Sequence, residues 1–249
     1  MGRRSSRPRR ILSPFEIVTI VVASTAGAIV HGSVGIGLTL VAGPALVAID
    51  ASFAPGPLLV AGQLVGCRHI VAERQHLDRG AYRHCLLGLP VGLVVGLALL
   101  ELLDDRAMAL IIGSLTATAA AAILGGLSGH RATTSEVGAG LFCALCSVTA
   151  GLPGPPLVIA FADMIPPVLR ATSAAVFMSV AVVAFFGLVA TGNFGAEEVR
   201  LTLWLVPGIL GGIVAARWVR PHVDHAWFRP AVLCVAFAGG SALVIRQLV

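Results

Sequence analysis

Long apolar runs with hardly any charge constrain the fold of this sequence more than any other feature. The runs 17–49 and 137–162 contain no aspartate, glutamate, lysine or arginine. Of all residues, 57% are hydrophobic and only 12% are charged. A soluble domain carries about 25% charged residues, so this chain cannot cover a surface that faces water. The runs therefore predict a polytopic protein of the cell membrane.

The uncharged runs favour transmembrane helices, because the strands of a membrane barrel alternate apolar and polar residues over about ten positions. No large polar block adjoins the runs, so we expect no soluble domain. The sequence predicts a polar, basic tail at 1–13 and a single transmembrane domain at 14–249. The expected partners are the lipid bilayer and a small anion, and the sequence permits a homodimer.

All fixed positive charge comes from arginine, since the sequence contains no lysine, and the formal net charge is +5. No basic patch is interleaved with aromatic residues, so we expect no nucleic-acid partner. The histidines show no metal-ligand spacing, and we expect neither a metal nor a cofactor. Cys143 and Cys146 share one helical face, which favours small apolar packing over a metal or redox site.

A glycine-rich break interrupts each of the two uncharged runs. The first break is His31–Gly37, between apolar segments at 14–30 and 38–49, and the second is Thr149–Pro156. Each segment around the first break is shorter than the ~20 residues that span a bilayer. The two segments form either one broken helix or a hairpin. In hydrocarbon, such a break survives only where it lines a cavity or is buried in protein.

An internal duplication relates the two breaks. Gly35 and Gly151 are 116 residues apart, and Pro90 and Pro207 are 117 residues apart. We therefore predict two repeats, 14–128 and 136–249, each with a broken or hairpin helix pair followed by three transmembrane helices. The expected full spans are 53–72, 84–103, 106–128, 171–191, 201–219 and 227–249.

Loop charges predict that the two repeats are inverted relative to each other. In repeat one, the arginine-rich loop 73–83 is followed by the acidic connection 101–106, whereas in repeat two the acidic loop 192–200 precedes the arginine-rich loop 217–229. Arginine-rich loops usually face the cytoplasm, and inverted repeats are common in secondary transporters. The fold class is thus an all-α bundle with ten apolar segments. The alternative has eight spans and parallel repeats, and it places the five arginines before Ile11 inside the cell.

The breaks predict a binding site for a small anion. The half-helix that begins at Leu38 points its N-terminus at the first break, and a helix N-terminus offers free N–H donors and about half a positive charge. Inversion would bring both breaks together near the membrane midplane. The alternative is that the glycines only permit tight packing or a kink. The predicted substrate-binding residues are His31, Ser33, Gly35, Gly37, Thr149, Gly151, Gly154 and Arg170.

Two of these residues have side chains that can carry charge. His31 could carry a coupling proton, and its alternative role is that of a hydrogen-bonded structural histidine. Arg170 is a candidate cationic contact for the substrate, and its alternative role is that of a cytoplasmic topology marker. We expect Pro166, Pro167 and Arg170 to lie in a loop.

The breaks resemble those of the TauE/SafE family of sulfite exporter-like anion permeases, in which each half carries a glycine-rich break leading to a proline. Gly35-Ile36-Gly37 precedes Gly43-Pro44 in repeat one, and Gly151-Leu152-Pro153-Gly154-Pro155-Pro156 lies in repeat two. Arg170-Ala171-Thr172 is similar to the family's Arg-Ala-Thr. The resemblance covers nearly the whole chain, from Pro14 to Val249. It implies a transporter for sulfite, a sulfonate or another small organic anion.

The expected function is export of a small anion by a secondary transporter that is not an enzyme. One alternative is an intramembrane enzyme that uses His31 or the Cys143 and Cys146 pair, although no nucleophile–base–acid set is visible. The other is a channel or receptor component that uses the same central cavity.

Overall fold

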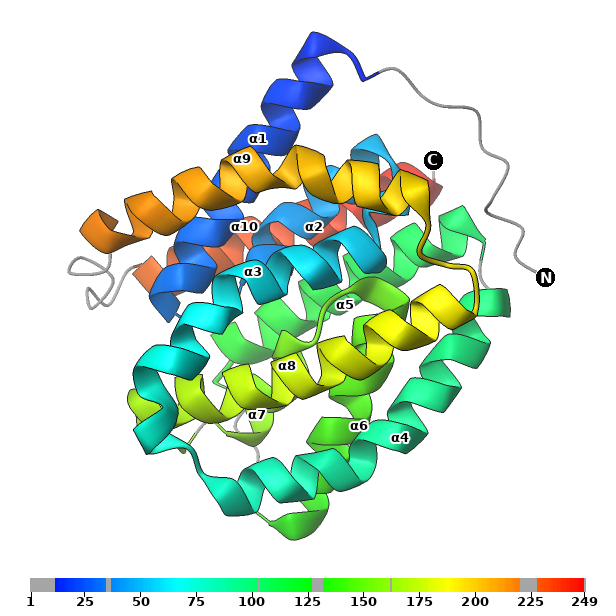
Figure 1. The fold of residues 1–249 in the computed structure, drawn as a ribbon. Helices are drawn as coiled ribbons and strands as arrows, with labels where there is room; N and C mark the ends of the chain where they lie inside the picture. The colour runs from blue at the N-terminus through cyan, green and yellow to red at the C-terminus, as the bar shows by residue number, and fades with distance from the viewer. Residues whose placement is uncertain are drawn as a thin grey trace.

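A computed structural model describes residues 12–34, 37–102, 104–126, 132–161, 163–219 and 228–248. Gly35, most of the basic tail and most of the loop 217–229 lie outside these ranges. Within them, all regular structure is helical (Figure 1). The helices within the predicted first repeat are α1 (Pro14–Val34), α2 (Leu38–Ile49), α3 (Gly56–Glu73), α4 (Arg79–Leu102) and α5 (Asp105–Leu124). Those within the predicted second repeat are α6 (Thr133–Ala150), α7 (Gly154–Ala160), α8 (Pro166–Ala190), α9 (Ala196–Val219) and α10 (Phe228–Leu248).

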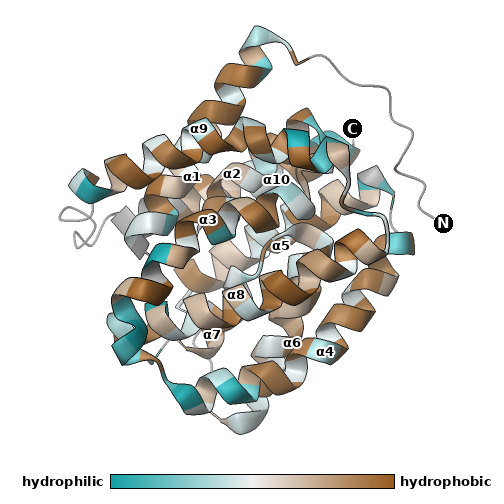
Figure 2. Cartoon of the chain, in the orientation of Figure 1, coloured by the Kyte–Doolittle hydropathy of each residue, from teal (hydrophilic) through white to brown (hydrophobic). Residues whose placement is uncertain are grey.

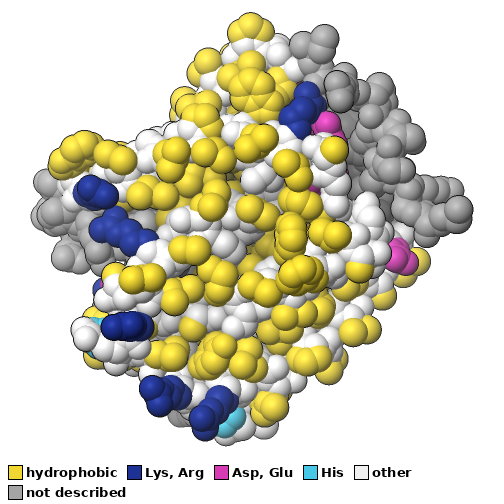
Figure 3. Space-filling model, viewed as in Figure 1, with side chains coloured by type: hydrophobic (Ala, Val, Ile, Leu, Met, Phe, Trp, Pro, Cys, Tyr) yellow, Lys and Arg dark blue, Asp and Glu magenta, His cyan; other side chains and the backbone are white. Residues whose placement is uncertain are grey.

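The outer surface of this bundle is apolar. Large hydrophobic side chains are exposed along α4 and α9, for example Leu87, Val94, Leu203 and Leu210. Figure 3 shows such side chains across one face, with arginines at its edge, and Figure 2 shows hydrophilic residues where α3 joins α4. Within the described ranges, α1, α4, α5, α8 and α9 are long and apolar enough to cross a membrane. The prediction of a multi-pass membrane protein is thus confirmed.

Helix α1 is longer than the sequence suggested. It has 21 residues and ends at Val34, so His31 and Ser33 lie in its last turn and not in the break. The prediction that both segments around the first break are too short to span a bilayer is therefore wrong for α1. The glycine at position 32 does not end the helix, because it packs at the contact with α9, where its Cβ would lie 3.1 Å from Ala216 Cβ.

The second break differs from the expectation on its far side. Helix α7 has seven residues and ends at Ala160. Helix α8 begins at Pro166, so the prediction that Pro166, Pro167 and Arg170 lie in a loop is wrong. Proline is well tolerated in the first turn of a helix, where an N–H would have no helical acceptor. Ile165 is extended, as the residue before a proline prefers.

Equivalent helices of the two repeats have equivalent surroundings. Both α4 and α9 have 24 residues with one internal proline, Pro90 or Pro207. Helix α4 packs on α6, and α9 packs on α1. Both contacts depend on glycine, because a Cβ on Gly92 would lie 2.0 Å from the Leu141 carbonyl oxygen and one on Gly212 would lie 2.6 Å from that of Thr25. Such small residues let membrane helices approach closely.

Contacts along the helices give their relative directions. Helices α4 and α6 are parallel, since Gly88 meets residue 137 and Gly96 meets residue 145. Helices α3 and α8 are antiparallel, since Gly56 meets Phe194 at one end and Glu73 meets Arg170 at the other. Helices α1 and α2 form a hairpin, in which residue 27 lies against residues 38 and 42. These directions are those expected of inverted repeats, and their orientation relative to a membrane stays a prediction.

The glycine contacts between α4 and α6 can be tested by adding bulk at Gly140. A Cβ at this position would lie 2.0 Å from the Cys85 carbonyl oxygen. Overpacking of a well-packed contact costs about 1–3 kcal/mol, and a clash with backbone cannot be relieved by a side-chain rotation. We expect Gly140→Val to lower the thermal unfolding temperature of the purified protein markedly. Gly211→Val is the matched control, because its site on α9 is exposed and has open space around the Cβ. Equal unfolding temperatures for the two variants would contradict the close contact.

Candidate functional site

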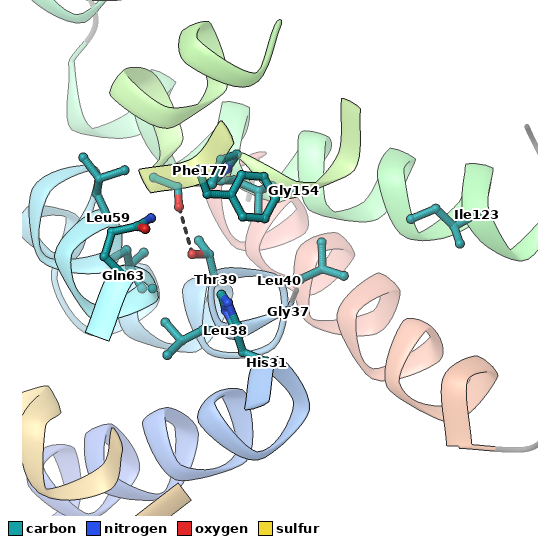
Figure 4. A pocket seen from close by; sticks show the side chains of 15 residues that line it. His31, Gly37, Leu38, Thr39, Leu40, Leu59, Gln63, Ile123, Gly154 and Phe177 are labelled. Carbon is teal, nitrogen blue, oxygen red and sulfur yellow. Dashed lines mark hydrogen bonds between the residues drawn. The ribbon is translucent and has the colours of Figure 1, made fainter. Parts of the chain in front are cut away.

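The two breaks meet at a small pocket in the interior of the bundle (Figure 4). Its volume is about 40 Å³. A cavity needs about 10–15 Å³ to hold one water, so the pocket has room for a few waters or a small oxyanion. It is lined by His31, Gly37, Leu38, Thr39, Leu40, Leu58, Leu59, Gly62, Gln63, Ile123, Gly151, Leu152, Pro153, Gly154 and Phe177.

A buried hydrogen bond joins one break to the other. The Thr39 hydroxyl, in the first turn of α2, donates to the carbonyl oxygen of Gly151 at 2.8 Å, the dashed line in Figure 4. Gly151 ends α6 with a left-handed φ of 64°. Its N–H donates to the Ser147 carbonyl, and the N–H of Leu152 donates to the Cys146 carbonyl, a closure that glycine at this position favours. The hydrogen bond from Thr39 therefore fixes the end of α6 against the start of α2.

The first turn of α2 lines the pocket. The first bond within this helix runs from the N–H of Val41 to the carbonyl of Gly37 at 3.0 Å. The N–H groups of residues 38–40, all of which line the pocket, have no acceptor within the helix. The N-cap residue of α2 is Gly37, which has no side chain to cap the helix. This helix end thus favours a bound anion.

Glycine is required where the chain enters α2. Gly37 has a φ of 134°, which side chains of L-residues rarely permit. A Cβ at Gly37 would also lie 2.7 Å from Val30 Cγ1 on the facing turn of α1. Both constraints keep a side chain away from the donors of α2.

Two polar side chains complete the pocket beside Thr39. His31 reaches it from the last turn of α1, and Gln63 reaches it from α3. A Cβ placed on Gly66 would lie 3.7 Å from His31 Nε2 and 3.8 Å from Gln63 Oε1, so both groups face the same part of α3. Of the described residues that line the pocket, His31 alone has a side chain that can become cationic.

The structure brings together only some of the residues predicted from the sequence. His31, Gly37, Gly151 and Gly154 all line the pocket. Ser33 is buried in α1 with no hydrogen bond from its hydroxyl in the described part of the chain, and it does not line the pocket. The Thr149 hydroxyl donates to the Leu145 carbonyl of its own helix at 2.8 Å, so it is not directed at the pocket. Gly35 is not among the described residues.

Arg170 lies outside the pocket lining and has a partner of opposite charge. Its Nε donates to both carboxylate oxygens of Glu73, at 3.0 and 2.9 Å. Nearby, the N–H of Asp78 donates to the Thr172 hydroxyl. These contacts hold the connection between α3 and α4 against the start of α8. Contact between Arg170 and the substrate stays a prediction, while in the structure this residue links the start of α8 to the end of α3.

Gln63 and Phe177 line the pocket but were not among the site residues predicted from the sequence. An amide within an apolar segment is a usable signal, because polar groups at membrane depth usually face protein or a cavity. Phe177 gives no such signal, since aromatic residues occupy both core and lipid-facing positions. Among the described residues, no group of three His, Cys, Asp or Glu side chains could hold a metal ion.

The model of the sulfite exporter TauE/SafE family matches residues 19–243, nearly the whole chain. The chain belongs to the TauE/SafE family. No curated protein and no solved structure matches it. TauE/SafE is a family of membrane transporters and not of enzymes, so the family resemblance and the expected absence of enzymatic activity are confirmed. As a member of this family, the protein is an anion exporter of the membrane.

The bond between the two breaks can be tested with Thr39→Val, which keeps the shape of the side chain. Removing the hydroxyl leaves the buried Gly151 carbonyl without this donor, and an unsatisfied buried acceptor costs about 1–3 kcal/mol. We expect a lower free energy of unfolding, measured by thermal denaturation in detergent. Thr118→Val is the control, because the Thr118 hydroxyl donates to its own helix at an exposed position. A larger loss in the control variant would contradict the assignment.

The ion pair of Arg170 and Glu73 can be tested by a double-mutant cycle with Arg170→Gln and Glu73→Gln. The two side chains are only 20% and 10% exposed, so their coupling should exceed the ~1 kcal/mol of exposed pairs. We expect the double variant to lose less stability than the sum of the losses of the two single variants. Each single variant leaves one poorly solvated charge without its partner, whereas the double variant leaves none. Additive losses in thermal denaturation would show that the two residues do not interact.

Proposed function

We propose that this protein is a secondary transporter that exports a small anion, such as sulfite or a sulfonate, bound in the pocket where the two breaks meet. The observation that carries the proposal is the N-terminus of α2. Its N–H groups at residues 38–40 have no acceptor within the helix, and these three residues line the pocket. These donors are arranged for an oxyanion, whereas a cation would meet a positive helix end.

The pocket suits transport because it holds its anion with dipoles and not with fixed charges. Of the described lining residues, none is arginine, lysine, aspartate or glutamate. A site of this kind can bind an anion and release it again without separating an ion pair. Export also needs no coupling ion, because an anion that leaves an inside-negative cell gains about 2.3 kcal/mol per charge at 100 mV. His31 offers a place for a coupling proton in addition.

We further propose that the two repeats have opposite orientations and rock about the pocket to expose it to each side in turn. Antiparallel packing of α3 on α8 supports this proposal, because inverted repeats relate their helices in that way. The Arg170–Glu73 pair then lies at the arginine-rich, cytoplasmic end of the bundle and would have to rearrange when the pathway opens there. A homodimer stays a prediction.

Filling the pocket at Gly62 tests the proposal directly. Gly62 lines the pocket, and a Cβ there meets no atom within 4 Å. The Cβ of a valine there has open space and adds bulk to the wall of the pocket, and valine has a higher helix propensity than glycine. We expect Gly62→Val to reduce saturable sulfite flux in proteoliposomes at least tenfold, with no fall in the unfolding temperature.

The matched control for this experiment is Gly211→Val, a helical glycine with equally open surroundings on the outer face of α9. It should transport sulfite like the wild type. Normal flux in Gly62→Val would place the anion elsewhere in the protein. Absence of flux of sulfite and of simple sulfonates in the wild type would contradict the proposed function.

A further inference from the structure

The symmetry between the two repeats is broken at α7. Its counterpart α2 has 12 residues and packs against α10 and α5 as well as α1. Helix α7 has only seven residues, and its main neighbours are α6 and α8. A groove of about 560 Å³ therefore lies between α5, α6 and α7. It is more than ten times larger than the pocket at the breaks.

This groove is apolar and reaches the outer surface. Leu115 and Ala122 line it from α5, Gly138 and Phe142 from α6, and Ile159 from α7. Phe142 is 56% exposed, so the groove opens toward the hydrocarbon of the membrane. Its lining on α6 extends from residue 135 to residue 146. At 1.5 Å per residue, this part of α6 is about 16 Å long.

The inner end of the groove adjoins the pocket. Leu152 lines both cavities, and the adjacent residues Ala122 and Ile123 line the groove and the pocket respectively. Leu152 is buried, with 3% of its surface exposed. The pocket itself has room only for a small oxyanion, so an organic substituent on that anion has to extend beyond it. The groove provides apolar space for such a substituent.

We propose that the groove between α5, α6 and α7 receives the apolar chain of an amphiphilic organic anion, such as an alkylsulfonate, whose head lies in the pocket. This proposal rests on the proposed function of the pocket. A membrane phospholipid fits the groove less well, because its charged head stays at the membrane surface, whereas the inner end of the groove shares Leu152 with the pocket at the break. Each methylene group that enters the groove should tighten binding about three- to fourfold.

The test compares straight-chain alkylsulfonates, from methanesulfonate to hexanesulfonate, as inhibitors of sulfite flux in proteoliposomes. The groove variant is Gly138→Leu, because Gly138 lines the groove and a Cβ there meets no atom within 4 Å, so a leucine adds apolar bulk to the groove wall. The control is Gly211→Leu on the outer face of α9. We expect inhibition by the wild type and the control to strengthen about three- to fourfold per methylene. Gly138→Leu should keep sulfite flux and inhibition by methanesulfonate but lose this gain.

Two outcomes would overturn the proposal. A wild type without any gain along the series would show that lipid, and not the substrate chain, fills the groove. An equal gain in Gly138→Leu would show that the longer sulfonates only partition into the bilayer.

If the wild type transports no sulfite, the proposed function fails, and the groove is tested by direct binding to protein in lipid nanodiscs. Tighter binding of hexanesulfonate than of methanesulfonate, lost in Gly138→Leu, then supports the groove as a binding site. Equal binding of the two sulfonates overturns it.

Discussion

In the hydrocarbon of a membrane, every backbone N–H and C=O group needs a partner, and the rest of this structure depends on how that demand is met at the two breaks. At the end of α6, Gly151 closes the helix with its own backbone, and its carbonyl accepts the Thr39 hydroxyl. At the start of α2, the N–H groups of residues 38–40 have no acceptor in the helix, and these three residues line the pocket. The protein itself therefore satisfies the end of α6, and the start of α2 is the part to which we assign the anion. In the proposed function, this helix end binds an oxyanion through the backbone.

The two breaks can meet because glycine brings the helices around them into backbone contact. Gly92 and Gly140 in the contact of α4 with α6, and Gly212 in that of α9 with α1, leave no space for a Cβ. These contacts hold the first helix of each repeat against the other repeat, so the breaks that follow these helices lie side by side. Apolar burial alone cannot do this in lipid, where tails are as apolar as side chains and close packing decides which helices associate.

Much of the fold could be predicted from the sequence, because long apolar segments without charged residues identify membrane helices. The two repeats stay a prediction, although Pro90 and Pro207 each lie inside a helix of 24 residues, α4 and α9. Predictions from single residue types were wrong at one glycine and at two prolines, because glycine and proline can either interrupt a helix or lie within one. Glycine at position 32 marked a break but lies within α1, and the two prolines at 166 and 167 indicated a loop but begin α8. Close packing against α9 accommodates the glycine within α1. Proline costs little in the first turn of a helix, where an N–H would have no helical acceptor.

By itself, the sequence determined a helical membrane protein with two glycine-rich breaks and a resemblance to TauE/SafE, because hydropathy and glycine content act locally along the chain. Only the tertiary structure decided which groups meet. It placed His31, Gln63 and Thr39 from three helices at one pocket, and it paired Arg170 with Glu73 instead. It also opened a groove beside α7, where the second repeat has a shorter helix than the first. These outcomes depend on distances between residues far apart in the chain, which no local pattern of residue types encodes.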